Sequence, residues 1–100
     1  ISKRVIIAYK EDEDKVIELI NPEILEVEGE AYGQEGCLSV PGKIGRVQRA
    51  RKIRVRGRNA KGESVEFEAE DMFARILQHE IDHLNGILFV DKAEQVEEIR

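Results

Sequence analysis

The sequence predicts an α+β fold in which a mainly antiparallel sheet packs around one central helix. Short apolar and β-branched segments separated by turn residues dominate the part of the chain that precedes Asp71. Only one internal stretch, residues 71–84, places its apolar residues at helical spacing. The composition is globular, with 41% hydrophobic and 37% charged residues among 100. This length fits a single domain over residues 1–100.

Strands separated by polar turns are expected in the first half of the chain. Three segments have strand composition, and they are residues 4–9, 16–20 and 23–28. Asn21-Pro22 is a turn signal between the last two of these strands. Residues 28–36 (EGEAYGQEG) are rich in glycine and predict a loop. Residues 37–40 form a short extended segment that ends at Pro41-Gly42.

A β-hairpin is predicted from residues 47–58 and 63–69, with residues 59–62 as its turn. Ile53 and Val55 alternate with arginines, a period of two that indicates a half-buried strand. The outer faces are rich in arginine and glutamate, which predicts cross-strand ion pairs. A basic stripe is also the footprint of an RNA-binding surface. Because glutamates are available as partners and the formal charge is -5, we expect no direct nucleic-acid contact.

The helix predicted over residues 71–84 has Glu70 or Asp71 as its N-terminal cap, and Asn85-Gly86 ends it. Its apolar face is expected to be buried, and Met72 is expected in the core with it. That face consists of Phe73, Ile76, Leu77, Ile81 and Leu84.

The end of the sequence predicts a short strand over residues 87–90 and the start of a polar helix over residues 93–100. The sequence starts at Ile1, directly in strand-like residues, and closes within that polar helix. We therefore expect a longer protein whose N-terminal segment and most of whose C-terminal helix are missing here. No apolar run approaches the roughly 18 residues that cross a bilayer, so no membrane partner is expected.

The informative motif is H-E-x-x-H, formed by residues 79–83 on the predicted helix. His79 and His83 are four residues apart, so they share a helix face and can bind one divalent metal. Glu80 stands beside them and can handle protons without being a ligand. The chain has only two histidines, both fall in this motif, and the flanking residues Leu77, Ile81 and Leu84 are apolar. This argues against a surface helix with two solvated histidines.

A catalytic metal site needs three protein ligands and an open coordination position. Phe89 occupies the place where one class of zinc peptidases carries its third histidine, which counts against an unrelated zinc peptidase. The remaining soft ligand is Cys37, the only cysteine. A lone cysteine is also often a small buried apolar residue, so the residues alone leave both roles open. The role of Asp82 is also left open by the residues alone: it either orients a metal ligand or is an exposed carboxylate on the helix.

Two segments resemble signature motifs of the peptide deformylases. They are E-G-C-L-S (Glu35 to Ser39) and Q-H-E-I-D-H (Gln78 to His83), in the family's order and at a similar separation. The hairpin between them and L-N-G-I-L-F (Leu84 to Phe89) also resemble this family. The resemblance implies a hydrolase that removes the N-formyl group from the N-terminal methionine of nascent polypeptides at the ribosome and releases formate. It also implies a bacterial cytoplasm or an organelle, and a lone cysteine fits such a reducing compartment.

By the same resemblance, the metal ligands are Cys37, His79 and His83. The ion it implies is Fe(II) in vivo, with zinc, nickel or cobalt as substitutes in preparations. Glu80 is implied to be the general acid and base. The backbone N–H of Leu38 is implied to stabilise the oxyanion.

The resemblance further implies that a glycine-rich loop pairs with the extended N-formylmethionyl peptide. The loop residues concerned are Gly33, Glu35 and Gly36. The family's first motif, G-x-G-L-A-A-x-Q, is absent, and its glutamine supplies a second oxyanion donor. Loss of one such donor costs about 10²–10³ in rate. We therefore expect residues 1–100 to bind metal and to be weakly active or inactive; the alternative is a non-catalytic metal-binding domain of the same fold.

Overall fold

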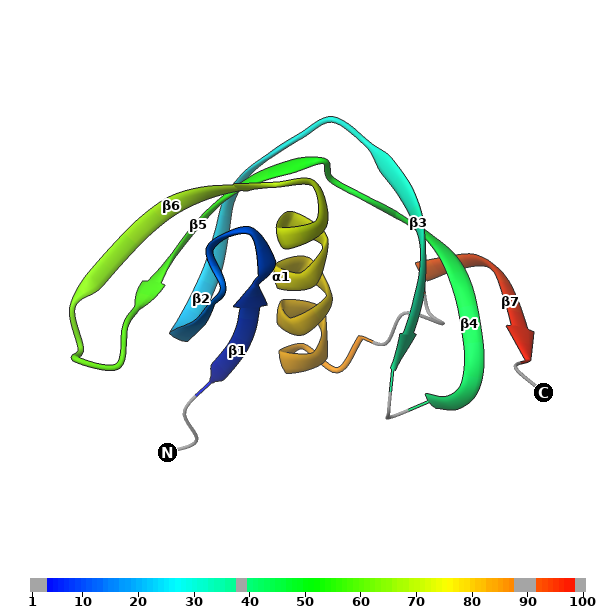
Figure 1. Cartoon of the computed structure of the whole chain (residues 1–100), viewed down its shortest axis with the longest axis horizontal. Helices are drawn as coiled ribbons and strands as arrows, with labels where there is room; N and C mark the ends of the chain where they lie inside the picture. Colours follow the sequence, from blue (N-terminus) through cyan, green and yellow to red (C-terminus); the bar gives the residue numbers. More distant parts are fainter. Residues whose placement is uncertain (1–3, 38–39, 88–91, 99–100) are drawn as a thin grey trace.

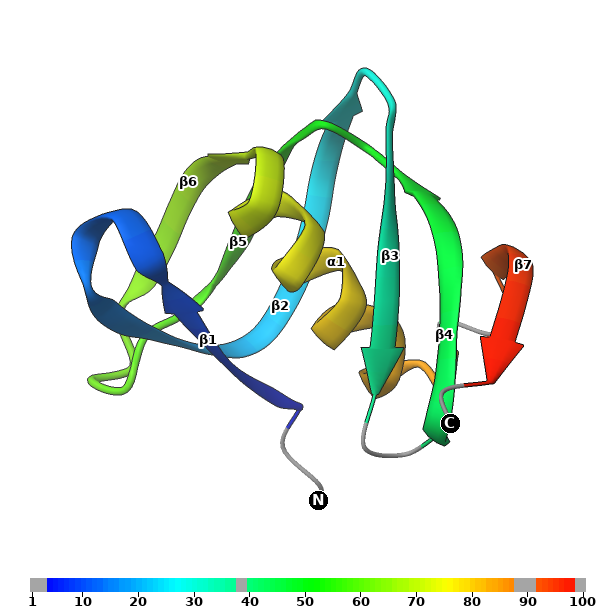
Figure 2. The same cartoon turned by 45° about the vertical axis from the view of Figure 1, so that its right-hand side comes forward.

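In the computed structural model, which describes residues 4–37, 40–87 and 92–98, two antiparallel sheets flank one helix (Figure 1). One sheet has the strand order β1-β2-β5-β6, and the other has the order β3-β4-β7. The elements are β1 (Val5–Lys10), the 3-10 turn η1 (Glu11–Glu13), β2 (Lys15–Glu28), β3 (Ala31–Cys37), β4 (Val40–Arg49), β5 (Lys52–Arg58), β6 (Ser64–Glu70), α1 (Asp71–Leu84) and β7 (Ala93–Glu98). Helix α1 lies between the sheets in both views (Figure 2), which confirms the α+β prediction.

The four-stranded sheet confirms the predicted first strand and, from Lys52 onward, the predicted hairpin of β5 and β6. Residues 47–49, predicted as the start of that hairpin, instead belong to β4 of the three-stranded sheet. The two strands predicted on either side of Asn21-Pro22 are instead one strand, β2. Asn21 has a φ of 53°, and the pairing of β2 with β5 shifts register between Ile20 and Glu23. The Asn-Pro signal therefore produces an irregularity of the bulge type within β2 and does not reverse the chain.

Two segments of the three-stranded sheet differ from the sequence prediction. Most of the glycine-rich segment 28–36, predicted as a loop, is strand β3, which pairs with β4 from Ala31 to Cys37. Residues 93–98, predicted as helix, are strand β7 on the other edge of β4. In both cases the hydrogen bonds that pair the segment with β4 outweigh its weak local preference for a loop or a helix. Residues 88–90 of the strand predicted over residues 87–90 lie outside the described residues.

The hydrophobic core lies between α1 and the four-stranded sheet. Its buried members are Ile6, Ala8, Leu19, Ile53, Val55, Ala69, Phe73, Ala74, Leu77 and Ile81. Met72, expected in the core, is 61% exposed because it points away from this face of the helix. Within the described part of the three-stranded sheet, Val47 is the only fully buried apolar side chain.

The ends of α1 fix where the H-E-x-x-H motif stands. Asn85 and Gly86, which has a φ of 76°, end the helix as predicted. At the start, the Glu70 side chain makes no capping hydrogen bond, and the Asp71 N–H instead donates to the Arg51 carbonyl at 2.8 Å. In the described ranges no helix is both long and apolar enough to span a bilayer.

Candidate metal centre

The last turns of α1 bring two imidazoles and a carboxylate together. The ring centroids of His79 and His83 are 4.5 Å apart, and the rings are tilted by 48°. Ligand atoms of His79, Glu80 and His83 all lie within 4.8 Å of one another, and all three side chains are half-buried. The four-residue spacing on a helix produces this convergence.

A buried glutamate on the three-stranded sheet contacts one of these imidazoles. Glu35, on β3, places Oε1 2.8 Å from Nδ1 of His79, and its side chain is only 5% exposed. Arg49 donates to both carboxylate oxygens, at 2.8 and 2.9 Å. Arg75 donates to Oε2 at 2.6 Å. The carboxylate thus accepts bonds from β4 and from two positions of α1.

These donors decide the charge state of Glu35. Burial raises its pKa, but the hydrogen bonds from Arg49, His79 and Arg75 outweigh burial and lower the pKa to about 2. Glu35 is therefore ionised at neutral pH. An ionised carboxylate only accepts hydrogen bonds, so Nδ1 of His79 is the donor in their contact.

Arg49 links this cluster to a second carboxylate. Its guanidinium also donates to Asp82, whose side chain is 14% exposed and lies 3.0 Å from the Lys92 ammonium. Asp82 is therefore an ion-pair partner inside the fold, and the alternative of an exposed helix carboxylate is wrong. Burial lowers the pKa of Arg49, but its hydrogen bonds to Glu35 and Asp82 outweigh burial. The pKa of Arg49 therefore lies above its ordinary value.

The basic stripe divides into two kinds of arginine. Arg49 is 2% exposed at its side chain and belongs to the buried cluster. Arg54 lies on the outer sheet face and pairs with Glu66 at 3.2 Å and with Glu68 at 2.7 Å. Arg56 pairs with Glu23 at 2.9 Å. The predicted cross-strand ion pairs are thus present.

The remaining residues singled out in the sequence lie on or next to β3. Gly33, Glu35 and Gly36 are within the strand, and β3 is an edge strand of its sheet as described. The backbone of Cys37 ends β3 opposite Val40, while its side chain lies outside what the structure describes. Leu38 also lies outside the described residues.

The described residues fit a divalent metal. A metal-binding histidine typically donates its second ring N–H to a carboxylate, which turns the other nitrogen toward the ion. Glu35 and His79 form this arrangement, with His83 one helical turn away. Imidazole donors suit zinc, iron and nickel ions.

The sequence analysis did not predict that Arg75 contacts Glu35, nor that the Arg49 side chain is buried. Arg49 has the same parity as the buried Val47 on β4, so strand alternation alone places its charge inside the fold. Arg75 precedes His79 by four residues and shares its helix face. Both patterns can be read from the sequence. Neither shows which carboxylate the arginine meets, because that depends on how the chain folds.

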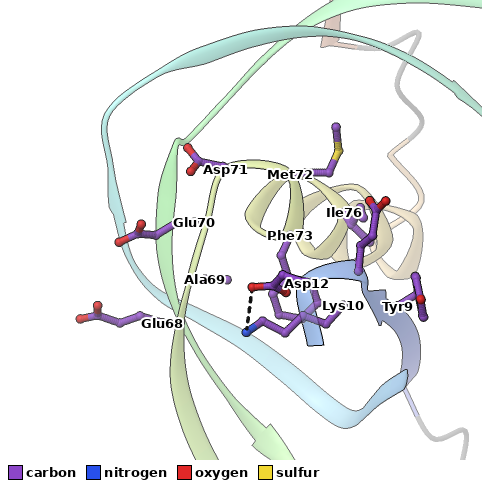
Figure 3. Close-up of a pocket in the computed structure, with 11 residues that line it drawn as sticks. Tyr9, Lys10, Asp12, Glu68, Ala69, Glu70, Asp71, Met72, Phe73 and Ile76 are labelled. Carbon is purple, nitrogen blue, oxygen red and sulfur yellow. Dashed lines mark ion pairs between the residues drawn. The ribbon is translucent and has the colours of Figure 1, made fainter. Parts of the chain in front are cut away.

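A hollow of about 700 Å³ lies elsewhere, between the end of β1, the end of β6 and the first turns of α1 (Figure 3). Tyr9, Met72, Phe73 and Ile76 are among its lining residues. None of the residues lining it is a predicted site residue, so this hollow is separate from the histidine pair.

Fold and site together define an α+β domain of the H-E-x-x-H class, in which a strand-borne carboxylate holds one helical histidine. The sequence model of the family described as "Polypeptide deformylase" matches residues 1–98. The chain belongs to this family.

Individual relatives agree with this assignment. The chain is 53% identical over 98 residues to a peptide deformylase of Halothermothrix orenii, covering 98% of the chain and 64% of the relative. A ligand-bound class I type b peptide deformylase of Acinetobacter baumannii matches with a TM-score of 0.85 and 47% identity, over 92% of this chain and 62% of that one. A structure of the A. baumannii protein with Met-Ala-Ser bound matches with a TM-score of 0.80 and 42% identity, over 92% and 64%. The chain spans 60–64% of the length of the first curated relatives it matches.

Proposed function

We propose that this chain carries the metal centre of a peptide deformylase, which removes the N-formyl group from the N-terminal methionine of nascent polypeptides and releases formate. One observation supports this most directly. Glu35, at the start of the E-G-C-L-S motif on β3, and His79, in the Q-H-E-I-D-H segment of α1, are far apart in sequence and meet through a hydrogen bond. A site for N-formylmethionyl chains leaving the ribosome implies a bacterial cytoplasm or an organelle.

Cys37, His79 and His83 would hold the ion, with Fe(II) as the resident metal and zinc, nickel or cobalt as substitutes. When bound, the ion would supply the Lewis acidity that cleavage of a formamide requires. A thiolate and two imidazoles form a donor set that such metals accept. The position of Cys37 at the end of β3, the strand that also carries Glu35, supports its inclusion.

Glu80 is the proposed proton carrier. Its carboxylate lies in the same cluster as the two imidazoles, so it is within reach of a water that attacks the formyl carbon. Glu80 would take a proton from that water and deliver it to the leaving amine. The Leu38 N–H would donate to the developing oxyanion.

The substrate is proposed to lie along the backbone of β3, at Gly33, Glu35 and Gly36. The free edge of this strand in the described sheet supports such pairing. The Glu35 side chain is engaged with arginines and His79, so only its main chain is available to a peptide. Met-Ala-Ser is bound to the A. baumannii relative, and it corresponds to a deformylated product of this reaction.

The test is formate release from formyl-Met-Ala-Ser by the metal-loaded chain, together with metal analysis. We expect one ion per chain and a rate about 10²–10³ below that of a deformylase with both oxyanion donors. Glu80→Gln should keep the metal and lower the remaining rate by about 10²–10⁴. Glu63→Gln, on the hairpin turn, is the matched control and should leave both unchanged.

Two outcomes would reject parts of this proposal. Full activity in Glu80→Gln would remove Glu80 as the proton carrier. An ion bound without any Glu80-dependent formate release would favour the non-catalytic metal-binding domain.

A further inference from the structure

We propose that Glu35 is a positioning residue for the metal centre: clamped by Arg49 and Arg75, it holds His79 in the tautomer that carries its proton on Nδ1 and so directs Nε2 toward the ion. This inference rests on the proposed metal centre but not on deformylation. It concerns which nitrogen of His79 is available and how firmly the ring is held.

The first step is the hydrogen-bond chemistry of the contact itself. The Oε1 atom of Glu35 lies 2.8 Å from Nδ1 of His79, and Arg49 donates to that same oxygen at 2.8 Å. A carboxylate between two arginines is anionic and has no proton to donate. His79 must therefore donate from Nδ1, and its neutral ring then carries the lone pair on Nε2.

The second step is that the carboxylate cannot turn away from His79. Arg49 reaches it from β4 through two nitrogens, Nε and Nη2, a paired geometry that fixes the carboxylate plane. Arg75 reaches it from α1 through Nη1. Rotation of the carboxylate would break bonds to both arginines in a buried setting, where unpaired charges are costly.

The third step is that Arg75 is itself fixed to the strand pair. Its guanidinium donates to the Ala31 carbonyl at 2.7 Å and to the Val47 carbonyl at 3.2 Å. It lies directly over Gly33, where an added Cβ would stand 3.0 Å from the Arg75 Cζ. Arg75 and His79 are one turn apart on α1, so the turn that carries the imidazole is tied to the strand that carries Glu35.

A purely structural ion cluster makes different predictions from a positioning device. If Glu35 only joined β3 to α1, its replacement would lower stability but leave the His79 tautomer and the metal affinity of the folded protein unchanged. Tautomer and affinity are therefore the deciding measurements.

The first measurement needs no substitution. Long-range ¹H–¹⁵N correlation spectra of the metal-free chain, at a pH where imidazoles are neutral, report the tautomer of each histidine. We expect His79 to be protonated on Nδ1. A predominant Nε2–H form of His79 in the wild-type chain would overturn the proposal.

The second measurement compares Glu35→Gln with Glu68→Gln, a control that neutralises an exposed glutamate on β6. Zinc affinity is measured by competition with a chelator, and folding is checked by amide spectra. Glu35→Gln should weaken zinc binding about 10–100-fold, while Glu68→Gln should not change it. Equal zinc affinity in the two folded variants would overturn the proposal.

Arg75→Met serves if Glu35→Gln does not fold, because it leaves Glu35 charged and still held by Arg49. It should weaken zinc binding in the same direction by a smaller factor and give His79 a mixture of tautomers. A folded Arg75→Met variant with wild-type affinity and a pure Nδ1–H tautomer would contradict the clamp. If the wild-type chain bound no zinc at all, the proposed metal centre would fail, whereas the tautomer spectrum would still test the clamp.

Discussion

Helix α1 lies between the two sheets (Figure 2). It meets them through interfaces of opposite chemistry. Toward the four-stranded sheet it buries apolar residues such as Ala74, Leu77 and Ile81. Toward the three-stranded sheet it presents Arg75 and His79, which meet the buried Glu35. The first interface stabilises without strong directional demands. The second consists of bonds that depend on distance and angle.

The difference matters because the two kinds of interface contribute differently to stability and to position. Apolar burial contributes roughly 25 cal/mol for each Å² removed from water. In a buried ion cluster the desolvation cost offsets most of the attraction between the charges, so the net stabilisation is small. Removal of one member is nevertheless severe, because it leaves a buried charge without its partner. We infer that the apolar interface supplies most of the stability of the fold. The ionic interface fixes the position of β3 relative to the histidines.

The largest effect should come from breaking the ionic interface at Arg49. Arg49→Ala leaves Glu35 and Asp82 without their shared partner, which should lower the free energy of unfolding by about 3–5 kcal/mol. Urea denaturation followed by circular dichroism measures this change. Hydrogen exchange should accelerate more in β3 and β4 than in β5 and β6. Equal acceleration in all four strands would show that the two interfaces are not separable.

A comparable but global effect is expected from the apolar interface. Leu77 is fully buried against the four-stranded sheet, so Leu77→Ala should cost about 2–5 kcal/mol of unfolding free energy. Leu77→Met, which nearly conserves volume, should cost less than about 1.5 kcal/mol. Exchange should accelerate across both sheets in Leu77→Ala, in contrast to Arg49→Ala. A loss confined to β3 and β4 would contradict this division of roles.

The apolar interface is also the part of the molecule that the sequence predicts well. Residues 71–84 show a helical repeat, and Asn85-Gly86 marks its end; the helix has these bounds. The alternation around Ile53 and Val55 likewise predicts β5 and its buried face. Apolar periodicity reports burial directly, because each such residue needs only some apolar surface to pack against.

The ionic interface was predicted only in part, because its strands depend on partners distant in sequence. β3 contains two glycines, and its conformation follows from pairing with β4 and from the Arg75 guanidinium over Gly33. β7 is polar and follows from the edge of β4. The convergence of the two histidines follows from their spacing. Glu35 was expected in a peptide-binding loop, and it lies in strand β3. Its side-chain role was missed, since nothing local shows which histidine or arginine a carboxylate will meet.

A moderate effect is expected where the ionic interface is most closely packed. Gly33→Ala places a Cβ 3.0 Å from the Cζ of Arg75, which three hydrogen bonds hold in place. We expect a loss of about 1–3 kcal/mol, the usual cost of overpacking. Thermal and urea unfolding measure it. In an Arg75→Met background the same substitution should be nearly neutral, and an unchanged loss there would show that Arg75 is not the cause.

The smallest effect is expected for the exposed ion pairs of the hairpin, which resemble the buried cluster in charge but not in environment. Arg54 pairs with Glu66 and Glu68 on the outer sheet face, where solvent screens the charges. Arg54→Ala should therefore cost only about 0.2–1 kcal/mol, and the cost should shrink further in high salt. Urea denaturation at low and high ionic strength measures both quantities. A cost equal to that of Arg49→Ala would mean that burial is not what separates the two arginines. A small, salt-sensitive cost for Arg54→Ala would show that exposure to solvent is what separates Arg54 from the buried Arg49.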